Sequence, residues 1–287
     1  MKKTALILDI DNTLTPPRRP LTEAMVHILD RLLVPFHVAA GSHLELLRGQ
    51  FFEPLYRYGF RKQFEAFISL GGVHYRCDYS RGMGMEVVST FDIREHLGEE
   101  DYGRLIRALE ETLAHPQFRL PAPVRVVGET ITCRGPMVNL CPAGRARVES
   151  DEYRANREAF VKFDEADGYR QRMMERLRSE LAPLVEQRQL RIVLGGQTSF
   201  DISIEGRDKT YAVRRLLEDG YESLVFMGDA LFEGGNDAPI RHFVERWGGD
   251  GPCPVEAVQV ESYHDTVRRM VERGLLPPEA ASVLSSE

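Results

Sequence analysis

The sequence predicts an α/β protein in which helices cover both faces of a parallel sheet and an α+β segment is inserted into the chain. Short aliphatic runs alternate with amphipathic helical patterns near both ends of the chain, and the middle interrupts this alternation. Alternating strands and helices are typical of a parallel sheet. The 287 residues, 43% hydrophobic and 28% charged, suit one large or two moderate domains.

The predicted elements begin with residues 4–10 (TALILDI), a nearly continuous aliphatic run typical of a strand that is buried on both faces. Apolar residues then recur at helical spacing from Leu21 to Leu32, and Thr22 stands where an N-cap is expected. Further strands are predicted at 36–40, 66–70, 191–194, 223–227 and 257–260, and further helices from about 43, after 209, after 236 and over 264–275.

The central segment has a different pattern. It contains a helical pattern at 99–115, strand-like pieces between 124 and 141, and a charged helical pattern at 167–187. We therefore predict that 1–83 and 189–287 together form the parallel domain, and that 84–188 form an inserted α+β domain.

Composition and charge limit the partners. With 37 basic and 44 acidic residues the net charge is −7, so we expect no nucleic-acid partner. Asp9 and Asp11 interrupt the first apolar run too early for a signal peptide, and no run is long enough to span a membrane. The four cysteines form no C-x-x-C pair. A reduced, cytoplasmic protein is expected.

The end of the first strand carries two carboxylates, in the sequence Asp9-Ile10-Asp11-Asn12-Thr13. Ligands of open α/β sheets bind outside the carboxyl ends of the strands. An extended backbone sets Asp9 and Asp11 on one side, where they can share a cation. Mg²⁺ favours carboxylates together with substrate phosphate. For this motif alone, a solvated acidic turn is an equally good interpretation.

Three further strand ends carry compatible chemistry. Ser42, before a helix, offers a hydroxyl for a phosphoryl oxygen, although in isolation it is more often a simple N-cap. Lys209 is either a phosphate-neutralising cation or an exposed first-turn residue. Asp229 precedes the glycine-rich stretch Gly234 to Asp237, which can wrap around a metal or phosphate. Together these residues favour a phosphoryl-transfer site.

Four stretches resemble the eukaryotic-type phosphomannomutases of the haloacid dehalogenase (HAD) superfamily: DIDNTLTPPR at 9–18, RGPMVNLCPAGR at 134–145, GGQTSFDISIEGRDK at 195–209 and GDALFEGGND at 228–237. The likeness runs from Lys3 to about residue 275. It implies a HAD-type, Rossmann-like core with a C2-type cap formed by the insertion. The chain departs from the family at Asn12, where glycine is usual.

The resemblance also implies residue roles. Asp9 would be the nucleophile and Asp11 the general acid/base, with Asp229, Asp9 and the Asp11 carbonyl binding Mg²⁺. Ser42 and Lys209 would hold the transferring phosphoryl group. The residues implied for substrate binding are Arg18, Arg134 and Arg145 for the other phosphate and the sugar, Ser199 and Asp201 for hydroxyls, and a further cap arginine, for which Arg157 is preferred and Arg154 is the alternative.

The activity implied is a phosphohexomutase that interconverts mannose 6-phosphate and mannose 1-phosphate, with glucose phosphates as further candidate substrates. It would require Mg²⁺ and a hexose 1,6-bisphosphate as activator, and would form a homodimer through the cap. One alternative is a sugar-phosphate phosphatase, in which water accepts the phosphoryl group. Another is a non-catalytic phosphosugar-binding protein, which predicts the loss of Asp9, Asp11, Lys209 or Asp229; all four are present.

Overall fold

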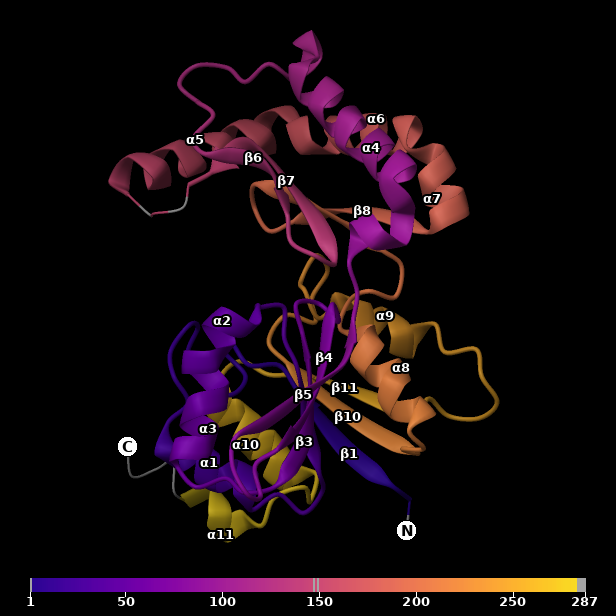
Figure 1. Cartoon of the computed structure of the whole chain (residues 1–287). Helices are drawn as coiled ribbons and strands as arrows, with labels where there is room; N and C mark the ends of the chain where they lie inside the picture. Colours follow the sequence, from indigo (N-terminus) through magenta and orange to yellow (C-terminus); the bar gives the residue numbers. More distant parts are fainter. Residues whose placement is uncertain (1, 147, 149, 283–287) are drawn as a thin grey trace. The chain divides into compact units, whose positions relative to one another are not determined.

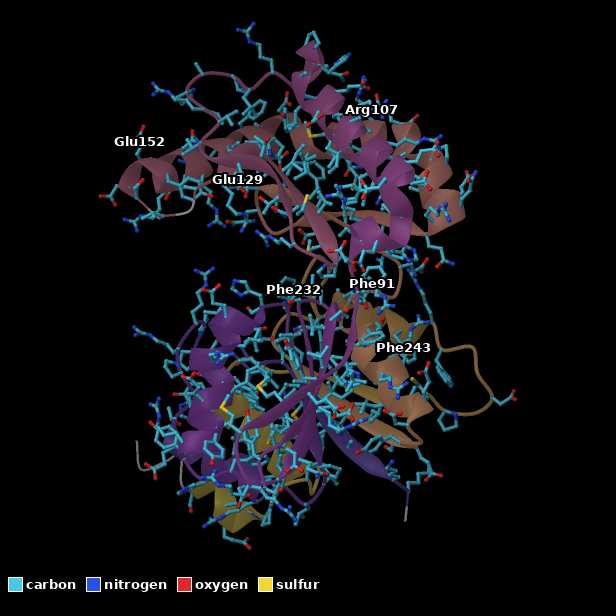
Figure 2. All side chains as sticks on the ribbon, in the orientation of Figure 1. Phe91, Arg107, Glu129, Glu152, Phe232 and Phe243 are labelled. Carbon is cyan, nitrogen blue, oxygen red and sulfur yellow. The ribbon has the colours of Figure 1, made fainter. Side chains whose placement is uncertain are left out.

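The computed structural model describes residues 2–146, 148 and 150–282, which form two compact units (Figure 1). The larger unit comprises Met1–Thr90 and Gly206–Glu287, and the smaller comprises Phe91–Glu205. Phe91, labelled in Figure 2, begins the smaller unit. The predicted boundaries at 83/84 and 188/189 are therefore displaced: residues 84–90 belong to the larger unit and 189–205 to the smaller one.

A seven-stranded sheet forms the centre of the larger unit, in the order β11-β10-β1-β2-β3-β4-β5. The first five strands in this order are parallel, which confirms the predicted parallel sheet, and β4 and β5 extend it in antiparallel fashion. Pairing with β4 is what places residues 84–90 in this unit. The strands are β1 (Thr4–Leu8), β2 (Phe36–Ala39), β3 (Gln63–Ile68), β4 (Val73–Asp78), β5 (Gly84–Thr90), β10 (Ser223–Gly228) and β11 (Val255–Gln259).

Side chains of β1 alternate between two apolar clusters. Leu6 and Leu8 join the cluster that contains residues of α1 and α10, whereas Ala5 and Ile7 join the one that contains residues of α8 and α9. The sheet is thus covered by helices on both faces, as predicted. The helices are α1 (Glu23–Asp30), which Thr22 caps, α2 (Leu44–Leu47), a π-helical turn (Arg48–Phe52), α3 (Glu53–Arg57), α8 (Thr210–Glu218), α9 (Ala238–Glu245), α10 (Tyr263–Glu272) and α11 (Pro278–Ala281).

The smaller unit contains a four-stranded antiparallel sheet in the order β6-β7-β9-β8. Its apolar core includes Leu105, Leu109, Phe160, Met173 and Phe200. The elements are α4 (Ile93–Ala114), a 3₁₀ turn (Pro116–Phe118), β6 (Glu129–Cys133), β7 (Met137–Arg145), α5 (Asp151–Asp167), α6 (Tyr169–Glu180), α7 (Ala182–Arg188), β8 (Leu190–Gly195) and β9 (Ser199–Ile204).

Two predictions for this unit need correction. The strand at 191–194 does not belong to the parallel sheet, because β8 turns back at Gly196, whose φ is +53°, and pairs antiparallel with β9. Helix α5 was not predicted; Phe160 is its one fully buried side chain among those described, so it lacks a clear apolar stripe. Within the described chain, no helix is both long and apolar enough to cross a membrane.

Candidate active site

Three neighbouring parallel strands bring their carboxyl ends to one edge of the larger sheet. β1 lies between β10 and β2, so Asp9, Ser42 and Asp229 follow adjacent strands. The Asp9 N–H donates to the Met227 carbonyl at 3.0 Å, which continues the β1–β10 ladder up to the first acidic residue. A cavity of about 310 Å³ opens here, and Asp9, Asp11, Ser42 and Asp229 line it.

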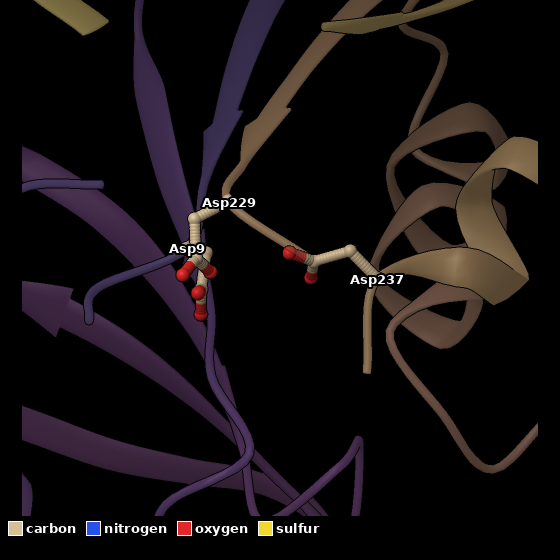
Figure 3. A group of neighbouring side chains, drawn as sticks. All are labelled: Asp9, Asp229 and Asp237. Atoms are coloured by element: carbon tan, nitrogen blue, oxygen red, sulfur yellow. The ribbon is translucent and has the colours of Figure 1, made fainter. Parts of the chain in front are cut away.

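Three carboxylates meet at this edge. Oxygen atoms of Asp9, Asp229 and Asp237 lie within 4.8 Å of one another (Figure 3). Asp237 directly precedes α9 and is completely buried, and its Oδ2 accepts the Ala230 N–H at 3.1 Å. A Cβ on Gly228 would lie 2.3 Å from the same oxygen, so the close approach of Asp237 requires glycine at that position.

Lys209 stands between two of these acids. Its side chain is 1% exposed, and Nζ lies 2.6 Å from Asp9 Oδ1 and 2.5 Å from Asp237 Oδ1. Burial acts to lower the pKa of Lys209, but attraction to Asp237 and Asp9 outweighs it, and the pKa is raised above its usual value. Lys209 is therefore a buried cation, and the alternative of an exposed first-turn residue is wrong.

Burial has the opposite effect on Asp9. Desolvation raises its pKa from 3.8 to about 6, Lys209 counteracts part of this shift, and the negative charge of Asp237 adds to it. Three carboxylates and one ammonium leave two uncompensated negative charges. A divalent cation would compensate them, and a set of oxygen donors suits a hard cation such as Mg²⁺. The residues present therefore fit a magnesium ion.

The carboxylate of Asp11 is engaged elsewhere. Its Oδ1 accepts the Gln50 Nε2–H at 2.6 Å and the Arg18 backbone N–H at 2.8 Å. Asp11 is not one of the three acids that cluster, so only its main-chain carbonyl remains as the predicted ligand, and Asp237 joins the acidic group instead. The sequence analysis assigned no role to Asp237 or Gln50. For Asp237, its place at the end of the glycine-rich stretch was a signal that could have identified it.

Asn12 supports one of the clustered acids, and Ser42 lines the cavity. Asn12 adopts φ +56° and donates from Nδ2 to Asp229 Oδ2 at 2.8 Å, so the residue that replaces the family's glycine holds one of the clustered acids. His43, not Ser42, is the N-cap of α2. The interpretation of Ser42 as a simple N-cap is therefore wrong, and its place in the cavity wall agrees with a role in binding.

In the smaller unit, an electrostatic group forms around β7 and β9. The pKa of Asp201 is raised, because the effect of burial outweighs the lowering by a 2.7 Å hydrogen bond from Asn139 and by the charges of Arg134 and Arg145. Partial desolvation and the nearby charge of Arg145 lower the pKa of Arg134, and Asp201 acts against them. Arg134, Arg145 and Asp201 therefore lie close enough for their charges to affect one another.

Ser199, Arg157 and Arg18 differ in their surroundings. Ser199 is buried and its hydroxyl donates to the Gly195 carbonyl at 2.7 Å, which leaves its oxygen lone pairs available. Arg157 reaches from α5 toward Gln197 on the β8–β9 turn. Its charge, like that of Arg145, acts to lower the pKa of Cys141. Arg18, in the larger unit, is exposed, with φ +58°.

The two candidate cap arginines are not equivalent. Arg154 forms an ion pair with Asp151 on its own helix, whereas Arg157 extends to the turn that precedes Ser199. Both line a hollow of about 450 Å³. Of the two, Arg157 is the one whose side chain extends toward the turn beside Ser199.

Solved structures share this fold. Aspergillus fumigatus trehalose-6-phosphate phosphatase matches with a TM-score of 0.56 and 13% identity, covering 100% of this chain and 94% of its own. Plasmodium falciparum IMP-nucleotidase, truncated at its N-terminus and bound to IMP, matches with a TM-score of 0.55 and 12% identity, covering 100% and 69%. These likenesses show a HAD-type fold, and its larger unit carries the buried aspartate–lysine group at the sheet edge.

Sequence comparison identifies the family within this class. A family model described as eukaryotic phosphomannomutase matches residues 38–271. Phosphomannomutase 2 of Dictyostelium discoideum is 32% identical over 241 residues, covering 83% of this chain and 87% of the relative. Phosphomannomutase of Glycine max is 30% identical over 236 residues, covering 82% and 85%. The chain belongs to the eukaryotic phosphomannomutase family, which confirms the resemblance proposed from its motifs.

Proposed function

We propose that the protein is a phosphohexomutase that interconverts hexose 6-phosphate and hexose 1-phosphate, with mannose as the sugar and glucose as a further candidate. The observation that carries the proposal is the buried Lys209, which holds Asp9 at 2.6 Å inside a cavity that Asp11 also lines. A carboxylate fixed in this way is suited to attack phosphorus, because phosphoryl transfer depends mainly on positioning and charge stabilisation. Membership of the phosphomannomutase family supports the choice of reaction.

In the first half-reaction an oxygen of Asp9 would form a bond to phosphorus while the bond from phosphorus to the sugar oxygen breaks. Asp11 would give its proton to the leaving sugar oxygen, and would later take a proton from the hydroxyl that accepts the phosphoryl group. Lys209 and Ser42 would hold the phosphoryl oxygens. Asp9, Asp229 and the Asp11 carbonyl would hold Mg²⁺, with Asp237 beside them, and the ion would stabilise charge on the phosphoryl group.

The smaller unit would bind the rest of the substrate. Its arginines are suited to phosphate, because the planar guanidinium makes paired hydrogen bonds to phosphate oxygens. Arg134, Arg145 and Arg157 would take the phosphate that is not being transferred, and Ser199 and Asp201 the sugar hydroxyls. Arg18, in the larger unit, would be a further substrate ligand. A hexose 1,6-bisphosphate would act as activator by supplying the first phosphoryl group to Asp9.

We further propose a homodimer formed through the smaller unit, where an open hollow of about 870 Å³ has an apolar part lined by residues such as Leu120, Val124 and Val126. Val126 is 58% exposed. The molar mass in solution, measured by light scattering, tests this proposal. A cytoplasmic location also remains a proposal, with which the four free cysteines agree.

The test of function is a single reaction containing purified protein, Mg²⁺, mannose 1-phosphate and glucose 1,6-bisphosphate, in which mannose 6-phosphate and inorganic phosphate are followed together. Mannose 6-phosphate that accumulates well ahead of phosphate, and is lost in Asp9→Asn, supports the mutase. Phosphate without the 6-phosphate identifies a phosphatase instead. Tight sugar-phosphate binding without turnover would identify a non-catalytic binding protein.

A further inference from the structure

Gln50 is buried at the active-site edge and the proposed chemistry gives it no task. Its side chain is 3% exposed, and Nε2 lies 2.6 Å from Asp11 Oδ1. No partner among the described residues reaches its other amide atom, Oε1, which is also buried. Leaving a buried acceptor without a hydrogen bond is costly, because its lost hydrogen bond to water is not replaced. An amide kept in the core at such a cost suggests a functional role for the Nε2–H group, which donates to Asp11.

The backbone around Gln50 is also unusual. Residues Arg48–Phe52 form a π-helical turn between α2 and α3. A π turn inserts an extra residue into a helix and is frequent at functional sites. Here Gln50 points into the core while Gly49 is exposed, and the Gln50 carbonyl accepts the Leu21 N–H at 2.9 Å. The turn thus fixes the backbone from which the amide reaches Asp11.

The two donors to Asp11 converge on one oxygen. The Gln50 amide and the Arg18 backbone N–H both bind Oδ1, at 2.6 and 2.8 Å, and no donor to Oδ2 is present in the described part of the chain. An oxygen that already accepts two hydrogen bonds is a poor site for a proton. Oδ2 is therefore the atom suited to carry the transferred proton, and the two donors hold the carboxyl plane in one orientation.

We propose that Gln50 is a positioning residue for the general acid/base: it fixes the orientation of Asp11 so that Oδ2 is presented to the leaving sugar oxygen. This inference rests on the proposed function, because it assumes that Asp9 accepts the phosphoryl group while Asp11 donates a proton. The proton moves from Asp11 Oδ2 to the sugar oxygen as the bond from phosphorus to that oxygen breaks and the bond to Asp9 forms.

The role predicts a dependence on the leaving group. Nitrophenolate leaves without being protonated, whereas a sugar alkoxide does not, so only the sugar phosphate needs a positioned acid. The test is the single-turnover rate of phosphoryl transfer to Asp9 in Gln50→Met, from glucose 1,6-bisphosphate and from p-nitrophenyl phosphate, with Mg²⁺ present. We expect the rate from the sugar phosphate to fall about 10- to 100-fold, with unchanged apparent affinity, and the rate from nitrophenyl phosphate to stay within about 2-fold.

Two controls separate positioning from structure. Gln63→Met removes an equivalent bond, the 2.8 Å contact of an exposed glutamine with Asp78, and should change neither rate. Asp11→Asn should show the Gln50 pattern in stronger form. Because methionine removes the unpaired Oε1, we expect Gln50→Met to melt at the same temperature as wild type. That result would show that the variant is folded.

Either of two results would overturn the inference. In one, Gln50→Met reacts as fast as wild type with both phosphoryl donors; in the other, its rates with the two donors fall equally. Wild-type protein that releases phosphate without forming mannose 6-phosphate would overturn the mutase function instead. The two failures are distinguishable, since the contrast between the donors is measured on the first half-reaction alone.

Discussion

The ammonium of Lys209 lies 2.6 Å from Asp9 Oδ1, and both side chains are buried. A buried charge that loses its partner is strongly destabilising, at about 3–5 kcal/mol. Here Lys209 also pairs with Asp237, which is 0% exposed, so one cation holds two buried acids.

Replacing this cation should therefore both destabilise and inactivate the protein. We expect Lys209→Met, measured by urea unfolding without Mg²⁺, to lose about 3–5 kcal/mol and to lose turnover of sugar phosphate. Adding Asp237→Asn should restore part of the stability, because it removes one of the two stranded charges. Arg268→Met, which breaks the ion pairs of an exposed arginine with Glu272 and Asp265, should cost much less. Equal losses in the two methionine variants would contradict this account of the buried pair.

His37 should make stability depend on pH. It is 5% exposed, its Nδ1 accepts the Glu65 N–H at 3.1 Å, and Nε2 lies 3.2 Å from the Tyr221 hydroxyl. Burial lowers its pKa from 6.5 to about 4; Glu65 opposes this shift, while His74 and Lys3 add to it. Between these values the unfolded chain takes up a proton that the folded one does not, so the His37 contribution is present above pH 6.5 and is lost as pH falls toward 4.

The measurement is urea unfolding of wild type and His37→Gln at pH 7.5 and pH 5. The stability advantage of wild type should shrink by about 2 kcal/mol at pH 5, which corresponds to about 1.5 pH units below 6.5. His27 is exposed, and His27→Gln should show no such change. An advantage that is the same at both pH values would exclude a neutral, buried His37.

Asn12 should tune the metal site. Its amide holds Asp229 Oδ2 at 2.8 Å. Residues that orient a metal ligand typically contribute 10- to 100-fold in affinity, so Asn12→Gly should weaken Mn²⁺ binding about 10-fold by electron paramagnetic resonance. Because Asn12 has φ +56°, glycine also relaxes the backbone. Gln189→Gly, at φ +54° in the smaller unit, controls for that effect. Unchanged Mn²⁺ affinity in Asn12→Gly would show that Asp229 needs no such support.

The sequence predicted the chemistry better than the connections. Asp9, Ser42 and Asp229 could be assigned to one sheet edge because parallel strands align their carboxyl ends. The strand at 191–194 was placed in the wrong sheet, since a run with only three aliphatic residues looks the same in a buried parallel strand and in an antiparallel strand. The turn at Gly196 was the missed signal for a hairpin.

Contacts between distant residues were harder to predict. Gln50 lies 39 positions from Asp11, in a π turn that has no propensity signature. Asp237 was quoted within its motif, but its burial beside Lys209 depends on how closely Gly228 lets the loop approach. Such pairings follow from tertiary packing, which periodicity does not encode.

Arg157 and Arg154 offer a matched test of substrate binding in the smaller unit. Both lie on α5 and both are exposed, but Arg154 pairs with Asp151 while Arg157 reaches Gln197. A guanidinium that binds phosphate makes charge-assisted hydrogen bonds of about 1.5–3 kcal/mol, so Arg157→Gln should raise the KM for mannose 1-phosphate about 10- to 100-fold. Arg154→Gln should leave KM within about 2-fold. Steady-state kinetics with a fixed concentration of glucose 1,6-bisphosphate measures both, and the reverse order of effects would assign the phosphate ligand to Arg154.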